Sequence, residues 1–372
     1  MNILFITYKH LSVGEGGLRS VSFLRALADA GHQVDVVAAG ITMPPHDNIR
    51  ILAGGDSRLC SRRRIRFATL RAMSRRSYTA VHAVDEAIIY VARLSRLKRT
   101  HIVYEAARCF TGANADAPSF WWKLFPTHYH KLEKKILRRT SLVFSSCSDL
   151  TSDLGKLVED IHVMQIEDVP AHALFSRKEL IGCVTDPAFE SSASFIVVCS
   201  VLPGNEAELR TLLLSARKVI ERIPDAGFIF KGMAVKEGQA MAANLDIERR
   251  CLFLNHNEPE RFLVALGRAN AALFVPEPGR RYMHVEALTL LNSQALVVAI
   301  QETAYQALLN DGNCIQVDYT ATAIADGLLR ALNEPLIAYG LVADAQQLIA
   351  DRHSFSSFKH RIRMAYHAMT KS

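Results

Sequence analysis

Short apolar runs alternate along the chain with segments whose apolar positions recur every three or four residues. The runs are rich in Val, Ile, Leu and Phe, which is typical of strands buried on both faces of a sheet. In the first half they predict strands at residues 2–7, 34–39, 49–52, 80–84, 102–105, 142–145 and 162–165. In the second half they predict strands at residues 195–200, 227–231, 251–254, 271–275, 296–300 and 314–317. Helical segments lie between most of these strands, so the pattern predicts an α/β protein with parallel sheets.

The opening residues predict one complete βαβ unit. The strand at 2–7 leads into a loop that contains Gly16 and Gly17, and an amphipathic helix follows from residue 18. A "GHQV" turn then leads into the next strand. The glycine loop is expected at the C-terminal edge of the sheet, where open α/β sheets bind ligands. A second unit of this kind begins near residue 195, and two such halves imply a cleft between two ligand edges.

Two domains are expected because one core rarely extends over 372 residues. We predict an N-terminal Rossmann-like domain at 1–168 and a C-terminal one at 194–350. Residues 169–193 have no clear period and contain prolines and a glycine, which indicates a linker. The chain closes at 351–372 with an amphipathic helix that needs a surface to cover. Its apolar positions are Phe355, Phe358, Ile362, Ala365 and Met369.

The composition is that of a globular protein, with 49% hydrophobic and 22% charged residues, and it excludes a disordered chain. No apolar run approaches the ~20 residues that span a bilayer, and no signal-peptide pattern precedes the first strand. We therefore expect a cytoplasmic protein. The seven cysteines are odd in number and form no CxxC pair, which favours reduced thiols over a disulfide or zinc framework.

The basic excess lies entirely in the first half. Residues 1–168 carry 24 Lys/Arg against 16 Asp/Glu, whereas the remainder carries 20 against 21. The clusters at 62–66, 75–76, 93–99 and 131–139 predict either a solvated face or peripheral contact with an anionic membrane or acceptor. Aromatic residues at 120–125 precede the last cluster and suit a membrane interface, buried packing or the lining of an acceptor cleft. Nucleic acid is not expected, because no nucleic-acid-binding motif accompanies the charges.

The glycine loop does not fit the dinucleotide fingerprint GxGxxG. Arg19 stands at the third glycine position, where a side chain obstructs close contact between helix and strand. A nicotinamide oxidoreductase is therefore a minor alternative. Gly16 and Gly17 still place backbone amides at a helix N-terminus, which suits an anionic or hydroxyl-rich donor. A plain βα turn is the competing interpretation.

Four segments together carry a more specific signal. They are the opening unit, "AVHAVDEAIIYVARLSRLKRTHIVYEAARCF", "HYHKLEKKILRRTSLVFSSCSDL", and "GRANAALFVPEPGRRYMHVEALTL" with the following "ETAYQALLNDGNCIQVD". In order and spacing they resemble the family-four retaining glycosyltransferases of the GT-B fold. The resemblance implies two Rossmann-like domains facing across a cleft, with the C-terminal helix crossing back to the first. It also implies a nucleotide sugar as co-substrate, with no metal and no cofactor.

The resemblance places the donor sugar nucleotide mainly on the second domain. The second glutamate of the family's Glu-x7-Glu motif matches Glu286, whose carboxylate would accept from two vicinal ribose hydroxyls. The first glutamate, which contacts the donor sugar in the family, falls on Pro278. Proline cannot do this, but Glu277 lies one residue earlier and a shifted turn would present it.

The family also places an arginine and a lysine after the first strand of the second domain to neutralise the diphosphate. The matching positions hold Val201 and Glu206. Losing two charged hydrogen bonds would weaken binding or rate on the order of a hundredfold to ten-thousandfold. Lys231, Arg280 and Arg281 lie at expected strand ends or ligand-side loops and are the candidates to compensate.

Three residues of the first domain are expected on the acceptor side. His82 is placed near the end of its strand, Glu105 matches the glutamate of the family's "YEvR" segment, and Arg108 lies one residue after the position of its arginine. Asp85, after His82, is expected to cap the next helix. No catalytic base is assigned, because retaining transfer in this family does not depend on one defined nucleophile.

The favoured function is retaining transfer of a sugar from a nucleotide sugar to a glycan or lipid-linked acceptor, as in polysaccharide biosynthesis. The main alternative is a catalytically impaired homologue that serves as a binding or partner subunit, which the residues at 201, 206 and 278 favour. Sugar transfer predicts stabilisation by at least one UDP, GDP or ADP sugar, the impaired homologue predicts none, and a dehydrogenase predicts a response to NAD(P) instead.

Overall fold

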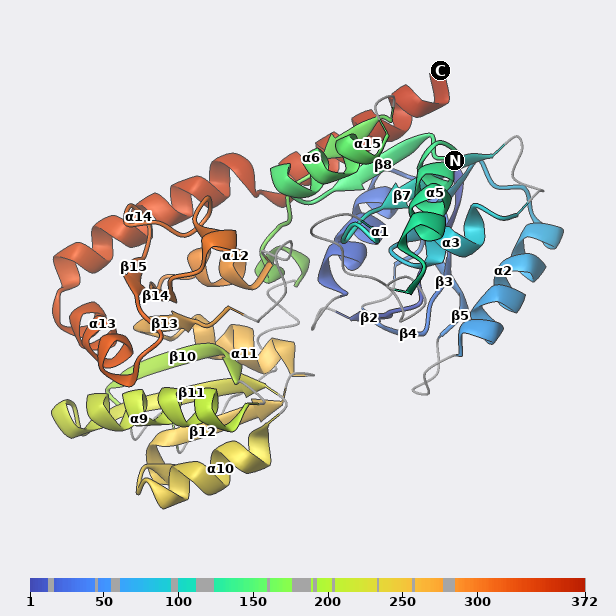
Figure 1. Cartoon of the computed structure of the whole chain (residues 1–372). Coiled ribbons are helices and arrows are strands. Elements are labelled where there is room, and N and C mark those ends of the chain that lie inside the picture. The colour runs from blue at the N-terminus through green and yellow to red at the C-terminus, as the bar shows by residue number, and fades with distance from the viewer. Residues whose placement is uncertain are drawn as a thin grey trace. The chain divides into compact units, whose positions relative to one another are not determined.

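The computed structural model describes residues 1–12, 17–43, 46–54, 61–94, 100–111, 124–158, 161–175, 189, 193–202, 205–232, 234–255, 258–276 and 285–371. The chain divides into two compact units. Unit 1 comprises Met1–Asp168 with Phe355–Ser372, and unit 2 comprises Val169–Ser354. Each unit contains one large parallel sheet with helices packed against it (Figure 1). None of the described helices is long and apolar enough to cross a membrane.

The main sheet of unit 1 has seven strands in the order β5-β3-β1-β6-β7-β8-β9, and every neighbouring pair is parallel. The strands are β1 Asn2–Ile6, β3 Gln33–Val37, β5 Ile49–Ala53, β6 Ala80–Val84, β7 His101–Glu105, β8 Leu142–Ser145 and β9 Val163–Gln165. The expectation of a parallel α/β sheet is confirmed. A separate two-stranded parallel sheet, β2 His10–Ser12 with β4 Gly40–Thr42, was not predicted. Each of its strands has three residues, too few to show a period.

The described helices of unit 1 are α1 Leu18–Asp29, α2 Arg62–Arg75, α3 Ala87–Val91, α5 Pro126–Leu137, α6 Ser148–Leu157 and the C-terminal α15 Phe355–Lys371. The prediction that the last helix covers a surface is confirmed, because α15 packs on α1 (Figure 1). The rings of Phe23 and Phe358 meet edge to face at 5.2 Å. The helix α1 is therefore buried on more than one side, with Phe23, Leu24 and Leu27 all fully inaccessible.

A buried carboxylate near the edge of this sheet accepts hydrogen bonds from several side chains. Asp35 on β3 accepts hydrogen bonds from Arg50 Nε and Nη2 at 2.9 and 2.7 Å and from the hydroxyl of Tyr78 at 2.6 Å. Burial alone would raise its pKa, but the bonds from Arg50 and Tyr78 together with the charges of Arg50 and Arg76 outweigh burial and lower the pKa. The ionised form of Asp35 is thus the one that stabilises the fold.

This lowered pKa predicts a loss of stability in acid. A carboxyl whose pKa is lower in the folded state contributes stability above its unfolded pKa of about 4, and that contribution disappears as the pH falls through the folded pKa. The difference in free energy of unfolding between the wild type and Asp35→Asn should therefore be largest near neutral pH and shrink below about pH 4. Urea unfolding of both proteins across this range measures the difference. A difference that does not change with pH would contradict the assignment.

The sheet of unit 2 has six parallel strands in the order β12-β11-β10-β13-β14-β15. The strands are β10 Phe195–Leu202, β11 Ala226–Gly232, β12 Cys251–Asn255, β13 Ala271–Phe274, β14 Leu296–Ile300 and β15 Ile315–Val317. The described helices are α9 Glu206–Arg222, α10 Val235–Asn244, α11 Pro259–Leu266, α12 Val285–Leu291, α13 Ala321–Asn333 and α14 Pro335–Arg352, with short 3-10 turns η2 Ala171–Leu174, η3 Glu248–Arg250 and η4 Thr303–Tyr305. All strands predicted for the second half are present, with ends shifted by one or two residues.

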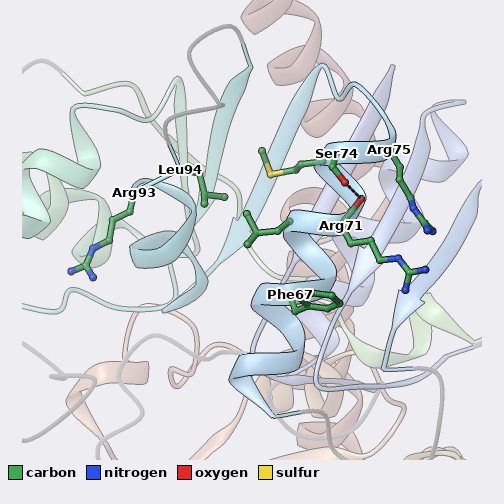
Figure 2. Close-up of a pocket in the computed structure, with 8 residues that line it drawn as sticks. Phe67, Arg71, Ser74, Arg75, Arg93 and Leu94 are labelled. Carbon is green, nitrogen blue, oxygen red and sulfur yellow. Dashed lines mark hydrogen bonds between the residues drawn. The ribbon is translucent and has the colours of Figure 1, made fainter.

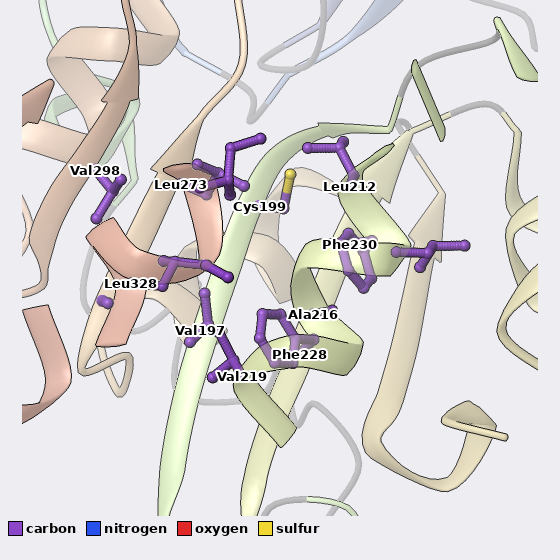
Figure 3. Close-up of a cluster of buried hydrophobic side chains, with 14 of the residues drawn as sticks. Val197, Cys199, Leu212, Ala216, Val219, Phe228, Phe230, Leu273, Val298 and Leu328 are labelled. Atoms are coloured by element: carbon purple, nitrogen blue, oxygen red, sulfur yellow. The ribbon is translucent and has the colours of Figure 1, made fainter. Parts of the chain in front are cut away.

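One face of this sheet is a continuous apolar core. Alternate residues of the strands, such as Val197 and Cys199 on β10 and Phe228 and Phe230 on β11, point to the same side. Figure 3 shows Leu212, Ala216 and Val219 of α9 packed onto these side chains, with Leu328 of α13 beside them. Helices α9 and α13 also contact each other. These helices therefore bury one face of the sheet.

The described cysteines, Cys109, Cys147, Cys199, Cys251 and Cys314, are free thiols, as predicted for that part of the chain. Burial raises the pKa of Cys109, Cys251 and Cys314 to about 12. These three thiols are therefore protonated at neutral pH and are unsuited to nucleophilic or metal-binding roles.

Candidate functional site

The strand order of unit 2 defines one place for a ligand. The chain runs from β10 to β11 and β12 on one side, then returns to β13, β14 and β15 on the other. The two directions diverge at β10 and β13, which are neighbours. Open α/β sheets bind ligands outside the carboxyl ends of strands at such a switch point. The candidate donor site therefore lies at the C-terminal ends of β10, β11 and β13.

Two predicted donor residues meet at this edge. Lys231 is the second-last residue of β11, and Glu286 lies in the first turn of α12, which follows β13 along the chain. Lys231 Nζ donates to Glu286 Oε1 at 3.2 Å. The ammonium group also lies 4.6 Å from the centre of the Phe262 ring. The lysine side chain is 10% exposed and the glutamate 31%, so the pair is sheltered but the carboxylate remains reachable.

Val201 and Glu206, the residues at the positions where the resemblance implies diphosphate-binding cations, have ordinary structural settings. Val201 lies within β10, which extends to Leu202. Glu206 is exposed and begins α9, where Asn205 caps the helix by accepting from the backbone amide of Ala207 at 2.9 Å. Glu206 and Glu208 in the first turn are favourable there because the helix N-terminus carries partial positive charge. The same carboxylates add negative charge close to the ligand edge.

The remaining donor candidates lie outside the described residues. These are Gly16 in the first loop, and Glu277, Arg280 and Arg281 in the segment before α12 that also contains Pro278. Their roles in donor binding stay predictions.

Unit 1 has a switch point of its own, between β1 and β6, because the chain runs from β1 to β3 and β5 and then returns to β6. Charged side chains converge there. Asp85, which directly follows β6, accepts from Lys9 Nζ at 2.9 Å and from Arg108 Nε at 3.2 Å. Arg108 also donates to Glu86 at 3.0 Å. Lys9, Asp85 and Glu86 were not among the predicted site residues, although each lies within two residues of a predicted strand end.

The prediction that Asp85 caps the next helix is wrong. Helix α3 begins after Glu86 and has no side-chain cap, because the Asp85 carboxylate is held by Lys9 and Arg108 instead. Asp85 is buried and adopts a left-handed backbone conformation with φ of 49°. Such backbone strain persists where the surroundings enforce it, and it clusters at ligand sites.

His82 and Glu105 are brought together, but inside unit 1. His82 lies in the middle of β6 rather than near its end, and its side chain is fully buried. Its Nε2 lies 3.2 Å from Glu105 Oε2 and its Nδ1 lies 2.6 Å from the hydroxyl of Tyr366 on α15. Burial raises the pKa of Tyr366 well above its usual range, so the hydroxyl beside Nδ1 stays protonated. Contact of these two residues with an acceptor stays a prediction.

Arg19 joins the same buried network. Its guanidinium donates to the backbone oxygens of Ile166 at 2.9 Å and Ser145 at 3.1 Å, and it pairs with the carboxylate of Asp168. Its Nε lies 3.8 Å from Glu105 Oε1, which also accepts from Ser20 at 2.9 Å. The residue that departs from the dinucleotide fingerprint therefore links α1 to the ends of β8 and β9.

Gly17 is explained by packing. A Cβ atom at this position would lie 2.5 and 2.6 Å from the backbone oxygen and nitrogen of Ser12 on β2. A side chain cannot fit unless the backbone moves, so Gly17 allows α1 to begin against the small β2–β4 sheet. This packing role is independent of ligand binding by its amide, which stays a prediction.

Gly17→Ala is expected to destabilise the protein by roughly 1–3 kcal/mol, the usual range for an overpacked site. Gly155→Ala on α6 is the matched control, since a Cβ there meets no atom within 4 Å. It should stabilise the helix by up to about 1 kcal/mol. Thermal unfolding of the two variants measures the contrast, and equal behaviour would contradict the packing argument.

Comparison with solved structures shows which fold this is. The chain is similar over its full length to sucrose-phosphate synthase from Thermosynechococcus elongatus, with a TM-score of 0.68, 14% identity and 99% of that chain covered. It is similar to Anabaena HepE solved in complex with UDP-glucose, with a TM-score of 0.67, 14% identity, and coverage of 99% of this chain and all of that one. A putative UDP-N-acetylglucosamine 2-epimerase from Listeria monocytogenes also aligns, with a TM-score of 0.68, 10% identity, and coverage of all of this chain and 96% of that one.

The chain has the GT-B fold, as the resemblance implied. Its two parallel α/β sheets and a C-terminal helix that packs on α1 are the elements that carry this likeness. No protein-family model matches the sequence, and no curated protein matches it either. The fold is thus shared with nucleotide-sugar-dependent transferases, while the chemistry must be argued from the side chains.

Proposed function

We propose that this protein transfers a sugar from a nucleotide sugar to a hydroxyl of a glycan or lipid-linked acceptor, with retention at the anomeric carbon and without a metal. The observation that carries the proposal is the Lys231–Glu286 pair at the switch point of unit 2. A carboxylate there can accept from the two ribose hydroxyls. A cation beside it supplies positive charge that the diphosphate requires and that Val201 and Glu206 do not provide.

The reaction would proceed by exchange at the anomeric carbon. The bond from that carbon to the phosphate oxygen breaks, the acceptor oxygen forms the new bond on the same face, and the acceptor proton leaves with the nucleoside diphosphate. No side chain is assigned as nucleophile or base. The protein's contribution is to position both substrates and to stabilise the charge that develops on the leaving diphosphate.

A second candidate function, that of a binding or partner subunit, is favoured by the negative charge at the start of α9. The start of α9 is a well-capped helix whose first turn carries Glu206 and Glu208, so this loop presents negative charge where the family presents cations. A chain with such a loop could bind the nucleotide sugar without transferring it and act as a binding or partner subunit.

Calorimetry with UDP, GDP and ADP sugars tests the proposal directly. Binding of at least one of them to the full chain is expected, followed by release of nucleoside diphosphate when a glycan or lipid-linked acceptor is added. Absence of binding to every sugar nucleotide, or binding with no release for any acceptor, would favour the partner subunit. Binding of NAD(P) with no response to the sugars would overturn both and favour an oxidoreductase.

A further inference from the structure

Helix α2 of unit 1 is basic along its whole length. Residues Arg62–Arg75 include six arginines and no acidic residue. Its inner face is narrow, because Ile65, Thr69 and Ala72 are the buried positions. Most of the helix surface is therefore available to something other than the protein's own core.

The outer face of α2 carries apolar side chains where solvent would favour polar ones. Phe67 is 67% exposed and Leu70 is 40% exposed. At about 100° per residue both lie on the side of the helix away from Ile65 and Ala72. Arg63 and Arg71 share that outer face and are also exposed. An exposed phenylalanine and leucine between arginines form an amphipathic surface directed outward.

These side chains border a hollow of about 660 Å³ between α2 and the residues that follow α3. Its apolar lining comes from Phe67, Leu70, Met73 and Leu94. Figure 2 shows Leu94 facing α2 across the hollow with Arg93 beside it, while the guanidinium groups of Arg71 and Arg75 extend from the opposite side of α2. The surface thus combines an apolar hollow with arginine side chains on either side of it.

We propose that this surface, formed by α2 with Arg93 and Leu94, docks on an anionic phospholipid membrane. Phe67 and Leu70 would enter the acyl boundary while Arg71, Arg75 and Arg93 contact lipid phosphates, as interfacial amphipathic helices do. The charge is complementary to such lipids. Nucleic acid fits less well, because binding of single strands uses several stacked aromatic rings and Phe67 is the one aromatic residue in the lining.

The position of α2 determines which edge of unit 1 would lie close to the membrane. Arg62 at its first turn pairs with Glu86, and its guanidinium lies 5.3 Å from the Tyr8 ring centre. Tyr8 and Glu86 follow β1 and β6, so α2 begins at the switch point of unit 1. Docking through α2 would hold that edge close to the membrane, where a lipid-linked acceptor is presented. The docking itself does not depend on sugar transfer.

Vesicle sedimentation of the full chain tests the proposal without donor or acceptor. The protein should bind vesicles of phosphatidylcholine mixed with phosphatidylglycerol, bind phosphatidylcholine alone far more weakly, and dissociate as salt is raised. Replacing Arg71, Arg75 and Arg93 by Ala should reduce the partition coefficient on the order of a hundredfold. Replacing Phe67 and Leu70 by Ser should reduce it at least about tenfold.

Matched controls come from exposed residues of unit 2. Leu336 and Tyr339 on α14 are 89% and 79% exposed, and their replacement by Ser should leave vesicle binding unchanged. The same is expected when the exposed Arg210, Arg222 and Arg249 become Ala. Circular dichroism confirms that every variant folds.

Two results would overturn the proposal. One is vesicle binding that falls equally in the control variants, because the effect would then reflect net charge alone. The other is binding to DNA oligonucleotides that requires the three arginines, with vesicle binding unaffected by the loss of Phe67 and Leu70. Neither result bears on the binding of sugar nucleotides by unit 2, so the sugar-transfer proposal is tested separately.

Discussion

Lys231→Met is expected to weaken nucleotide-sugar binding roughly ten- to a hundredfold, since a hydrogen bond to a charged group contributes about 1.5–3 kcal/mol. The change removes the cation that lies 3.2 Å from Glu286. The glutamate then loses its partner, and the diphosphate loses positive charge at the edge of the sheet. Calorimetry with the preferred nucleotide sugar measures the dissociation constant.

Glu286→Gln provides the complementary test, because it keeps the shape of the side chain and removes its charge. If the two residues act as a pair, the double variant should lose less affinity than the sum of the single losses. Lys231→Arg should retain most of the affinity. Lys218→Met, at an exposed position on α9, is the control and should bind as the wild type does. Wild-type affinity in a folded Lys231→Met protein would exclude Lys231 from the donor site.

The fold was predictable because most strands in the middle of its sheets are buried on both faces. Strand segments such as Val197–Cys199 and Phe228–Phe230 appear in the sequence as apolar runs. Because helices connect successive strands, the strands are expected to be parallel. The β2–β4 pair was missed because its three-residue strands, with exposed His10 and Thr42, carry no such signal.

The candidate site was predictable only in part. Lys231 and Glu286 could each be placed near the ligand edge, one from its strand end and the other from the resemblance. Their pairing depends on the strand order, which the sequence pattern does not contain. The hydrogen bond between His82 and Tyr366 joins residues 284 positions apart, and Tyr366 was not counted among the apolar positions of the last helix.

Asp85 shows why a local rule can fail. An aspartate before a helix normally caps it, and the sequence offers no sign that Lys9 and Arg108 lie within reach. The ion pairs hold the carboxylate away from α3 and keep the backbone in the left-handed region. At the switch point of unit 1, the ion pairs of Asp85 thus outweigh its local preference for capping a helix. Departures from local rules are expected to mark functional sites.

Arg19→Met is expected to destabilise unit 1 by about 3–5 kcal/mol, the usual effect of removing one partner from a buried ion pair. The side chain of Arg19 is 12% exposed, and that of Asp168 is 4% exposed. Without the guanidinium, the carboxylate of Asp168 and the backbone oxygens of Ser145 and Ile166 each lose one charged hydrogen-bond donor. Since the protein has two units, hydrogen exchange of the unit 1 strands measures the loss better than one global transition does.

Three variants distinguish the effect of breaking the buried contacts of Arg19 from the general effect of losing an arginine. Arg71→Met, at an exposed position on α2, should change stability by no more than about 0.5 kcal/mol. Arg19→Lys should fall between the wild type and Arg19→Met, because an ammonium group keeps the charge but cannot reproduce the planar fork that reaches several acceptors. Arg19→Met combined with Asp168→Asn should recover part of the loss, since the carboxylate that Arg19 neutralises is then absent. If Arg19→Met and Arg71→Met shift exchange in β8 and β9 equally, the buried network does not hold these strands to α1.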